Sequence, residues 1–325
     1  MKLSLEKRHL DLKVNWKLSR NQTTFKENFI LTLKSPLGDL LSEVAPNIRY
    51  GETPQKIEEQ FQSWPYENVN DLKSLQETLD IKPLFHSLRF ALESVFLKYF
   101  ALHEKKSLSD FLGLPPIKVV ETSFSMPIIP IAEIKDYLAP LSRFKSLKIK
   151  VNAETGMEML QEIKKYTDVK LRVDGNEAWS DFDAFMGFQE SLHGMNIELI
   201  EQPFPSSMTD EYKELKKKTP YVLLADESIE DVGDFSELSK QFHAINVKLM
   251  KTGSLLKARD LLFEAKKQGM KSMIGCMIET SVGISYGMLF SGMADYIDLD
   301  GFLLVKDEPF NYVTESDGLL RITPK

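Results

Sequence analysis

Cysteine is nearly absent from this sequence, since Cys276 is the only one among 325 residues. An intrachain disulfide is therefore excluded, and the cysteine usage gives no sign of an oxidising compartment. No histidine lies beside Cys276 in the sequence to activate its thiol. We therefore interpret Cys276 as a small wall residue rather than as a nucleophile.

Long apolar runs and an excess of positive charge are absent as well. No stretch approaches the ~20 consecutive apolar residues that a membrane helix requires, and the N-terminus carries charges where a signal peptide needs an apolar core. The net charge of −7 argues against a nucleic-acid partner, whose phosphates would require a basic surface. We expect a cytoplasmic protein that binds a small-molecule substrate and neither nucleic acid nor membrane. Homo-oligomer formation is left open.

The first third of the chain has a mixed pattern. Residues 3–15 and 28–34 alternate with the period of two that predicts strands, whereas Phe85–Phe100 carries apolar residues at helical spacing. The polar stretch Ser19–Glu27 is predicted to be a hairpin connection or a mobile loop. Residues 1–117 are therefore predicted to form an α+β domain.

From about residue 118 the pattern changes to short apolar runs that alternate with amphipathic helical stretches, about 25 residues apart. The predicted strands are 119–125, 147–151, 169–173, 197–200, 222–225, 244–249, 272–276 and 296–300. The predicted helices between them include 154–166, 182–192, 208–217, 255–267 and 281–291. Eight such units predict an α/β fold of the (β/α)8 TIM-barrel type over residues 118–305. Residues 306–325 are predicted to lie outside the barrel as a C-terminal segment.

Three consecutive predicted strands end in a carboxylate: Asp174, Glu201 and Asp226. The active site of a barrel lies where its strands end. Each acid alone is well explained as a helix cap, but three like charges at one rim are costly unless a cation neutralises them. Mg²⁺ prefers a few carboxylates and keeps positions for water or substrate. We predict one Mg²⁺ at these three residues.

Lysines end the strands on either side of these acids. Lys148 and Lys150 are two residues apart, so that they share a face of their strand, and Lys248 ends the sixth strand. Most lysines are solvated surface groups, and an inward lysine is costly unless carboxylates or a function compensate. We interpret Lys150 and Lys248 as bases on opposite faces of a substrate, and we expect Lys148 to tune the basicity of Lys150.

Together these motifs resemble the enolase superfamily and, within it, the muconate-lactonizing-enzyme subgroup. The resemblance covers nearly the whole chain. It rests on Lys148-x-Lys150, Asp174-x-Asn176, Glu201-Gln202-Pro203, Asp226-Glu227-Ser228 and Asn246-Val-Lys248-Leu-Met-Lys251-x-Gly253. Glu43-x-Ala45-Pro46 and Tyr50-Gly51-Glu52-Thr53 resemble the capping domain of these enzymes, and Ala91–Ser94 the helix before their barrel. The fold implied is a modified (β/α)7β barrel with an N-terminal α+β capping domain, toward which residues 306–325 return.

The resemblance implies a Mg²⁺-dependent proton transfer next to a carboxylate, through an enolate intermediate. Lys150 and Lys248 would be the acid and base of this reaction, and Lys148 would tune Lys150 or polarise the substrate carboxylate. Asn176 and Glu227 lie beside the metal ligands and would support them. Met277 would bind substrate.

Arg20 is a further candidate for substrate binding. It lies in the segment Ser19–Glu27, which in relatives closes over the substrate side chain. Its register against the arginine that binds glutamate-containing dipeptides is open by one position, so a particular substrate side chain is not implied.

Asp298 and Asp300 are the most informative specificity feature. Positions two apart on a strand share a face, here at the metal-bearing mouth. In dipeptide epimerases of this subgroup an Asp-x-Asp at this position binds the α-ammonium group of the substrate, and paired carboxylates suit a cation. We therefore favour a dipeptide epimerase acting on the α-carbon of the C-terminal residue. o-Succinylbenzoate synthases and cycloisomerases, whose substrates have no ammonium group, are the alternative.

Departures from the family pattern leave one more alternative. The end of the seventh strand, Ile274–Thr280, contains no histidine, which disfavours the mandelate-racemase-like branches. Asn152 and Ser254 replace two glycines that are usual in the family, and Gly175 replaces an alanine. These changes motivate the alternative of a non-catalytic small-molecule binder on the same barrel.

Overall fold

Eight parallel strands form the largest sheet of the computed structural model, which describes residues 1–19 and 21–323. Consecutive strands lie side by side, in the order of the sequence. The strands are β5 (Phe124–Met126), β6 (Ser146–Lys150), β7 (Lys170–Asp174), β8 (Ile197–Glu201), β9 (Val222–Ala225), β10 (Ala244–Lys248), β11 (Lys271–Gly275) and β12 (Tyr296–Asp298). The amide of Ser123 donates to the carbonyl of Ile297 at 3.2 Å and brings the first and last strands together as a barrel.

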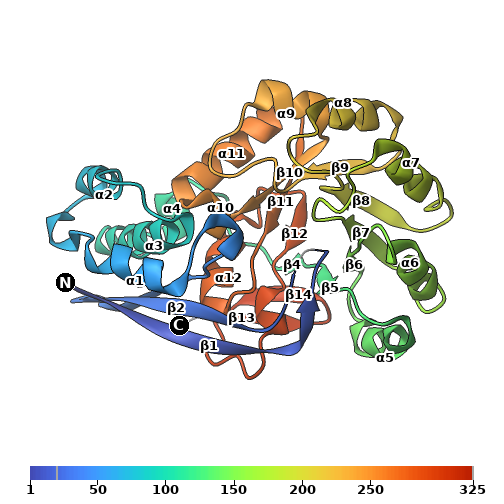
Figure 1. Cartoon of the computed structure of the whole chain (residues 1–325). Helices are drawn as coiled ribbons and strands as arrows, with labels where there is room; N and C mark the ends of the chain where they lie inside the picture. The colour runs from blue at the N-terminus through green and yellow to red at the C-terminus, as the bar shows by residue number, and fades with distance from the viewer. Residues whose placement is uncertain (20, 324–325) are drawn as a thin grey trace.

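Helices connect these strands and cover the outside of the barrel (Figure 1). They are α5 (Ile134–Leu138), α6 (Gly156–Lys164), α7 (Phe182–Glu190), α8 (Thr209–Lys218), α9 (Phe235–Gln241), α10 (Leu249–Thr252), α11 (Leu255–Lys267) and α12 (Ser281–Gly287). At the position where an eighth helix would directly follow β12, the chain forms the 3₁₀ turn Gly301–Leu304. The predicted (β/α)7β barrel is therefore confirmed. Within the described part of the chain, no helix has both the length and the apolar character needed to cross a membrane.

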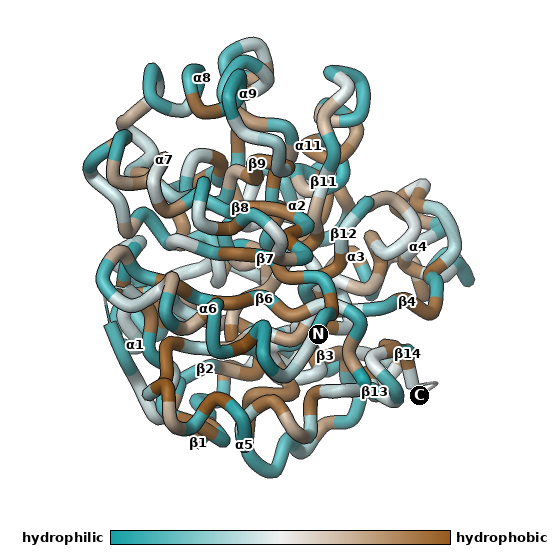
Figure 2. Tube along the Cα trace, turned by 90° about the vertical axis from the view of Figure 1, so that its right-hand side faces the viewer, coloured by the Kyte–Doolittle hydropathy of each residue, from teal (hydrophilic) through white to brown (hydrophobic). Residues whose placement is uncertain are grey.

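The barrel is apolar at its base and charged toward the strand ends. Every residue of β6 and β10 is buried, because side chains fill the inside and helices cover the outside. A separate small cluster inside the barrel contains Leu199, Leu224, Ala244, Met273 and Tyr296. Figure 2 shows the hydrophobic colour concentrated along the central strands, with more hydrophilic residues on the surrounding helices. The apolar base supports the charged residues above it.

Three antiparallel strands and four helices precede the barrel. The strands are β1 (Lys2–Lys17), β2 (Gln22–Ser35) and β3 (Gly38–Val44), and the helices are α1 (Pro54–Gln62), α2 (Leu72–Leu79), α3 (His86–His103) and α4 (Leu108–Phe111). The predicted hairpin connection is confirmed, but Ser19–Glu27 is too long for it, because β2 already begins at Gln22 and pairs antiparallel with β1. These residues border a cavity rather than an apolar core, so they lack the alternation that identifies a buried strand.

The C-terminal residues pair with the segment that enters the barrel. Strands β13 (Val313–Ser316) and β14 (Leu319–Ile322) form a sheet with β4 (Val120–Glu121). The predicted strand 119–125 is thus two strands, of which only β5 belongs to the barrel. The ammonium of Lys98 in α3 lies 5.8 Å from the ring centroid of Tyr312, which connects this segment to the N-terminal domain. The domain boundaries at residues 117 and 305 stay predictions.

Buried carboxylates of the N-terminal domain cap two helices of the barrel. Glu93 of α3 accepts from the amide of Leu255 at 2.6 Å and from the hydroxyl of Ser254 at 2.8 Å, where α11 begins. Glu43 of β3 accepts from the amide of Thr280 at 2.9 Å and from its hydroxyl at 2.6 Å, where α12 begins. The first amides of a helix have no intrahelical acceptor and attract negative charge. These contacts therefore fix the position of one domain on the other.

A second carboxyl group, Glu279, lies beside Glu43 at this joint. Both carboxyl groups lie against Gly283. A Cβ atom added at Gly283 would collide with Oε2 of Glu279 and would lie 3.0 Å from Oε2 of Glu43. Glu279 Oε1 accepts from the amide of Met277 at 2.8 Å. Burial and then the charge of Glu43 raise the pKa of Glu279 to about 8. Glu279 is therefore protonated at neutral pH, and this proton removes the repulsion that two neighbouring carboxylates would otherwise have.

This proton predicts a pH-dependent stability. The folded protein keeps the proton up to about pH 8, whereas the ordinary pKa is 4.5, so wild-type stability falls as the pH rises through this window. We expect the stability of Glu279→Gln relative to wild type to increase between pH 5 and pH 8 and then to level off. Urea unfolding from pH 5 to pH 9 measures this, with the exposed Glu133→Gln as control. Parallel pH profiles for wild type and Glu279→Gln would contradict it.

Candidate active site

The charged strand ends meet at one rim of the barrel. Lys150 of β6, Asp174 of β7 and Glu201 of β8 are register partners across neighbouring strands. Lys248 ends β10, four strands away from β6 in the sheet of eight. Since parallel strands end at the same edge, residues from distant parts of the sequence surround one site.

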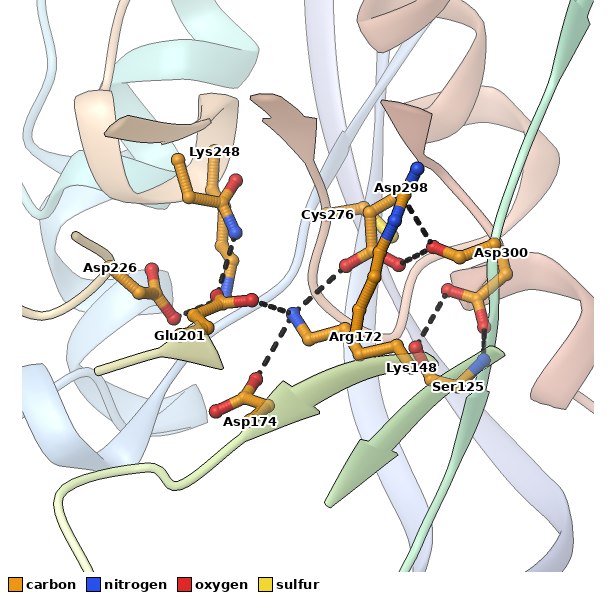
Figure 3. Close-up of polar contacts among 12 residues, drawn as sticks. Ser125, Lys148, Arg172, Asp174, Glu201, Asp226, Lys248, Cys276, Asp298 and Asp300 are labelled. Carbon is orange, nitrogen blue, oxygen red and sulfur yellow. Dashed lines mark hydrogen bonds and ion pairs between the residues drawn. The ribbon is translucent and has the colours of Figure 1, made fainter. Parts of the chain in front are cut away.

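Lys148 occupies the centre of this site (Figure 3). Its Nζ lies 3.0 Å from Asp174 Oδ2, 2.8 Å from Glu201 Oε2 and 3.0 Å from Asp298 Oδ2. Burial opposes the charged form of Lys148, but Asp298, Glu201 and Asp174 outweigh burial and raise the pKa of Lys148 well above its usual value. Lys148 therefore joins carboxylates from three strands as a fixed positive charge. Its predicted effect on the basicity of Lys150 stays a prediction.

The two proposed bases each bind a different carboxylate. Lys150 Nζ lies 2.5 Å from Asp174 Oδ2, and Lys248 Nζ lies 2.6 Å from Asp226 Oδ2. Lys251, to which the sequence assigned no role, lies 2.7 Å from Asp226 Oδ1. Burial opposes the charged form of Lys248, but Asp226 outweighs burial and raises the pKa of Lys248. Lys150 and Lys248 thus stand on opposite sides of the barrel mouth.

The three predicted metal ligands differ in the number of lysines that lie within ion-pair distance of them. Burial opposes ionisation of Asp174 and of Asp226, but two or more neighbouring lysines lower the pKa of each. Glu201 faces only Lys148 at ion-pair distance, and burial and then Asp174 raise the pKa of Glu201 to about 7. Of the three predicted ligands, Glu201 is therefore the one whose charged form the protein alone stabilises least.

Ammonium groups lie between these carboxylates. Within the residues that the structure describes, no three acidic, histidine or cysteine side chains converge on a point that could hold a metal ion. Instead, Asp174 Oδ2 contacts both Lys148 and Lys150. Asn246 adds a neutral contact, with its Nδ2 donating to Glu201 Oε1 at 2.9 Å. The carboxylates are thus held in place from several strands.

Asp298 and Asp300 both line the cavity but are placed by different means. Asp298 ends β12, whereas Asp300 follows the strand in a helical backbone conformation, so the predicted alternation along one strand is not the reason for their proximity. Asp300 is oriented by Ser125, whose amide donates to Oδ2 at 2.5 Å. Burial opposes ionisation of Asp298, but Lys148 outweighs burial and lowers the pKa of Asp298 to about 2. Burial and then Asp298 raise the pKa of Asp300 to about 7.

A cavity of about 710 Å³ lies above this rim. The predicted site residues that line it are Lys148, Lys150, Asn176, Asp226, Glu227, Lys248, Met277, Asp298 and Asp300. Asp174 and Glu201 are not exposed to solvent and lie behind these groups. Arg20 is outside the described residues. The structure therefore brings together every predicted site residue that it describes.

Small contacts support the acidic residues. The amide of Asn176 donates to Asp174 Oδ1 at 3.0 Å, and its side chain donates to Glu227 Oε1 at 3.4 Å. Gln202 accepts from the amide of Asp226 at 2.9 Å. The sequence motifs included Gln202 but gave it no task. Its position directly after Glu201 is the signal that could have identified it.

The N-terminal domain supplies the other wall of the cavity, including Trp16, Phe25, Lys26, Ile48, Arg49 and Tyr50. Several contacts hold this wall against the barrel, among them the following two. Ser19 Oγ donates to the carbonyl of Asn176 at 3.3 Å, and Arg49 lies 2.9 Å from Glu177. Of this wall, the sequence singled out the segment Ser19–Glu27 and the motifs that contain Pro46 and Tyr50. It did not identify Trp16, Ile48 or Arg49, because more than a hundred residues separate them from the barrel residues that line the same cavity.

Comparisons with known proteins agree with this geometry. Residues 132–315 match the model of the enolase C-terminal domain-like family. An L-Ala-D/L-amino acid epimerase of Pedosphaera parvula is 32% identical over 86% of this chain and 83% of its own. An L-Ala-D/L-amino acid epimerase of Flavobacterium johnsoniae is 29% identical over 98% of this chain and 96% of its own. These names bear out the predicted enzyme class, an isomerase.

Solved structures extend the likeness of the fold to the whole chain. The L-Ala-D/L-Glu epimerase of Bacillus subtilis superposes with a TM-score of 0.91 at 24% identity, covering 99% of this chain and 96% of that one. A dipeptide epimerase of Methylococcus capsulatus, solved with Mg and the dipeptide L-Arg-D-Lys, gives a TM-score of 0.89 at 24% identity, with 99% and 96% coverage. The family match, the relatives and the barrel lead to one conclusion: the chain belongs to the enolase C-terminal domain-like family of the enolase superfamily.

Proposed function

We propose that this protein is a Mg²⁺-dependent dipeptide epimerase, which inverts the α-carbon of the C-terminal residue by 1,1-proton transfer. One observation carries the proposal: Lys150 and Lys248 lie four strands apart in an eight-stranded barrel and line the same cavity. A substrate between them presents its two faces to two amines. The dipeptide epimerases among the relatives support the substrate class.

The proposed reaction needs one neutral and one protonated lysine. The neutral amine takes the α-proton, and the electrons of the broken C–H bond move into the adjacent carboxylate to give an enolate. The ammonium group of the opposite lysine then protonates the other face of the carbon. Configuration is inverted and no net proton is consumed. Lys148 is held in its charged form by three carboxylates. It therefore keeps a positive charge at the inner end of the site throughout the reaction.

Asp174, Glu201 and Asp226 would hold the Mg²⁺ ion. Their donors fit in kind, because all three are hard oxygen ligands that are no more than 4% exposed. Burial and then Asp174 raise the pKa of Glu201 to about 7, and a bound cation would favour its charged form. The chemistry that a bound Mg²⁺ supplies is electrostatic stabilisation of the negative charge that develops on the substrate carboxylate.

Asp298 and Asp300 would bind the α-ammonium group of the dipeptide. Asp300, whose pKa is raised to about 7, would lose its proton when a cation arrives and form a charge-assisted hydrogen bond. This role favours a dipeptide over the substrates of o-succinylbenzoate synthases and cycloisomerases. The complete set of lysines and carboxylates favours catalysis over a non-catalytic binder.

The lysines provide the first test. We expect Lys150→Met and Lys248→Met to lower kcat for epimerisation by ~100- to 10,000-fold, the usual contribution of acid–base catalysis, while dipeptide binding is largely retained. Exchange of the α-hydrogen in D₂O, followed by NMR across an L,L-dipeptide panel, measures this. Lys267→Met, an exposed lysine on α11, is the control. Full turnover in either cavity variant would contradict the assignment, and binding without any wild-type exchange would favour the binder.

Metal removal provides the second test. We expect dialysis against EDTA to abolish α-hydrogen exchange and Mg²⁺ to restore it. Thermal or urea unfolding gives a readout without activity, since Mg²⁺ at ~100 times its Kd should stabilise the fold by about 2.7 kcal/mol. Asp174→Asn and Asp226→Asn should lose most of this stabilisation. Equal stabilisation of wild type and both variants would place the metal elsewhere.

Asp300 tests the substrate class. We expect Asp300→Asn to raise KM for dipeptides by ~10-fold or more with a smaller change in kcat, because a charge-assisted contact to the substrate is weakened. Asp317→Asn, in the exposed turn between β13 and β14, is the control. Steady-state kinetics with one good dipeptide from the panel are sufficient. An unchanged KM would favour a substrate without an ammonium group.

A further inference from the structure

The capping side of the cavity contains a lysine that the proposed chemistry does not use. Lys26 lies in β2, two residues before Asn28, so both side chains leave the strand on the same face. Asn28 Nδ2 donates to the carbonyl of Ile278 at 3.0 Å. This face of β2 therefore looks toward the loop that follows β11. Lys26 lines the cavity there.

Lys26 differs from the lysines of the barrel in its partners. Its Nζ donates to the carbonyl of Pro46 at 3.2 Å. Across the described parts of the chain it forms no ion pair within 4.0 Å. By contrast, Lys148, Lys150 and Lys248 each have a carboxylate within 3.0 Å. Burial lowers the pKa of Lys26, and the charge of Glu52 only partly offsets this effect.

The nearby acidic groups are already engaged. Glu52 accepts from the amide of Asn47 at 2.9 Å and from the amide of Ser87 at 3.2 Å. Glu27, the next residue on β2, lies 3.5 Å from Lys7. A partly buried ammonium group without a counter-ion is costly. Such departures from stable design are expected where a ligand supplies the missing partner.

The charges of a bound dipeptide can be matched to the charges of the wall. Under the proposed function, the metal and lysine site takes the C-terminal carboxylate, and Asp298 with Asp300 takes the α-ammonium group. Arg49, the other capping-domain cation described at the cavity, is paired with Glu177 at 2.9 Å. Lys26 is then left to face a substrate side chain.

We propose that Lys26 binds the side-chain carboxylate of the dipeptide, so that the preferred substrates contain glutamate or aspartate. This inference rests on the proposed function, because it assumes that a dipeptide occupies the cavity. The ammonium group would exchange its contact with the Pro46 carbonyl for a charge-assisted hydrogen bond, which is roughly twice as strong as a neutral one. The apolar side chains of Phe25 and Ile48 line the same wall and suit the methylene groups of such a side chain.

The test compares substrates of equal shape and different charge. Wild-type kcat/KM is measured by α-hydrogen exchange with Mg²⁺ for L-Ala-L-Glu against L-Ala-L-Gln, and for L-Glu-L-Ala against L-Gln-L-Ala. We expect the acidic member of at least one pair to be favoured by ~10-fold or more, the range for a charged contact that its neutral analogue cannot replace. Equal rates within both pairs would overturn the inference. No exchange with any dipeptide would instead overturn the proposed function.

Variants then assign the preference to Lys26. Lys26→Met keeps the aliphatic part of the side chain and should remove most of the preference, chiefly through KM for the acidic substrate, with less than ~3-fold change for the neutral one. Lys26→Glu should favour dipeptides with a lysine side chain. Lys34→Met, an exposed lysine of the same strand, should keep the wild-type preference. An unchanged preference in a folded Lys26→Met protein would overturn the role of Lys26, and the wild-type pairs remain decisive if that variant does not fold.

Discussion

The compensation of buried charge at the strand ends governs this structure. Lys148, Lys150 and Lys248 each lie within 3.0 Å of a carboxylate, in a region where an isolated charge would be strongly unfavourable. Lys148 alone contacts acids from β7, β8 and β12. The same contacts that make these groups tolerable inside the barrel also set their orientation, so that stability and the site depend on one network.

The barrel and the N-terminal domain contribute different parts of the site. The barrel positions acids and bases through strand register, which is rigid because each strand from β6 to β11 is hydrogen-bonded to a neighbour on both sides. The N-terminal domain contributes a second wall, attached by buried carboxylates such as Glu43 and Glu93 at helix starts. Relatives of this protein are named for different substrates. This division of the site suits such a family, because the residues of the N-terminal wall can change while the residues at the strand ends stay the same.

The proton on Glu279 lies at the joint of this second wall. The ammonium group of Lys26, which contacts the Pro46 carbonyl and no carboxylate of the described residues, lies on the wall itself. Glu279 accepts from the amide of Met277, a residue of the cavity. Lys26 faces the loop that contains Met277 and Ile278. Groups that are poorly compensated in the protein alone thus lie near the substrate wall as well as at the strand ends, where the pKa values of Glu201 and Asp300 are raised to about 7.

The sequence by itself determined the barrel and its charged rim. Parallel strands end at one edge, so acids and lysines at the ends of β6 to β12 had to meet once the alternation of strands and helices was recognised. Tertiary structure alone decided that Lys148 is the centre of the network, that Asp300 lies beyond β12, and that residues 22–27 form a strand facing a cavity. Those features depend on contacts between segments far apart in the chain, and local periodicity carries no record of such contacts.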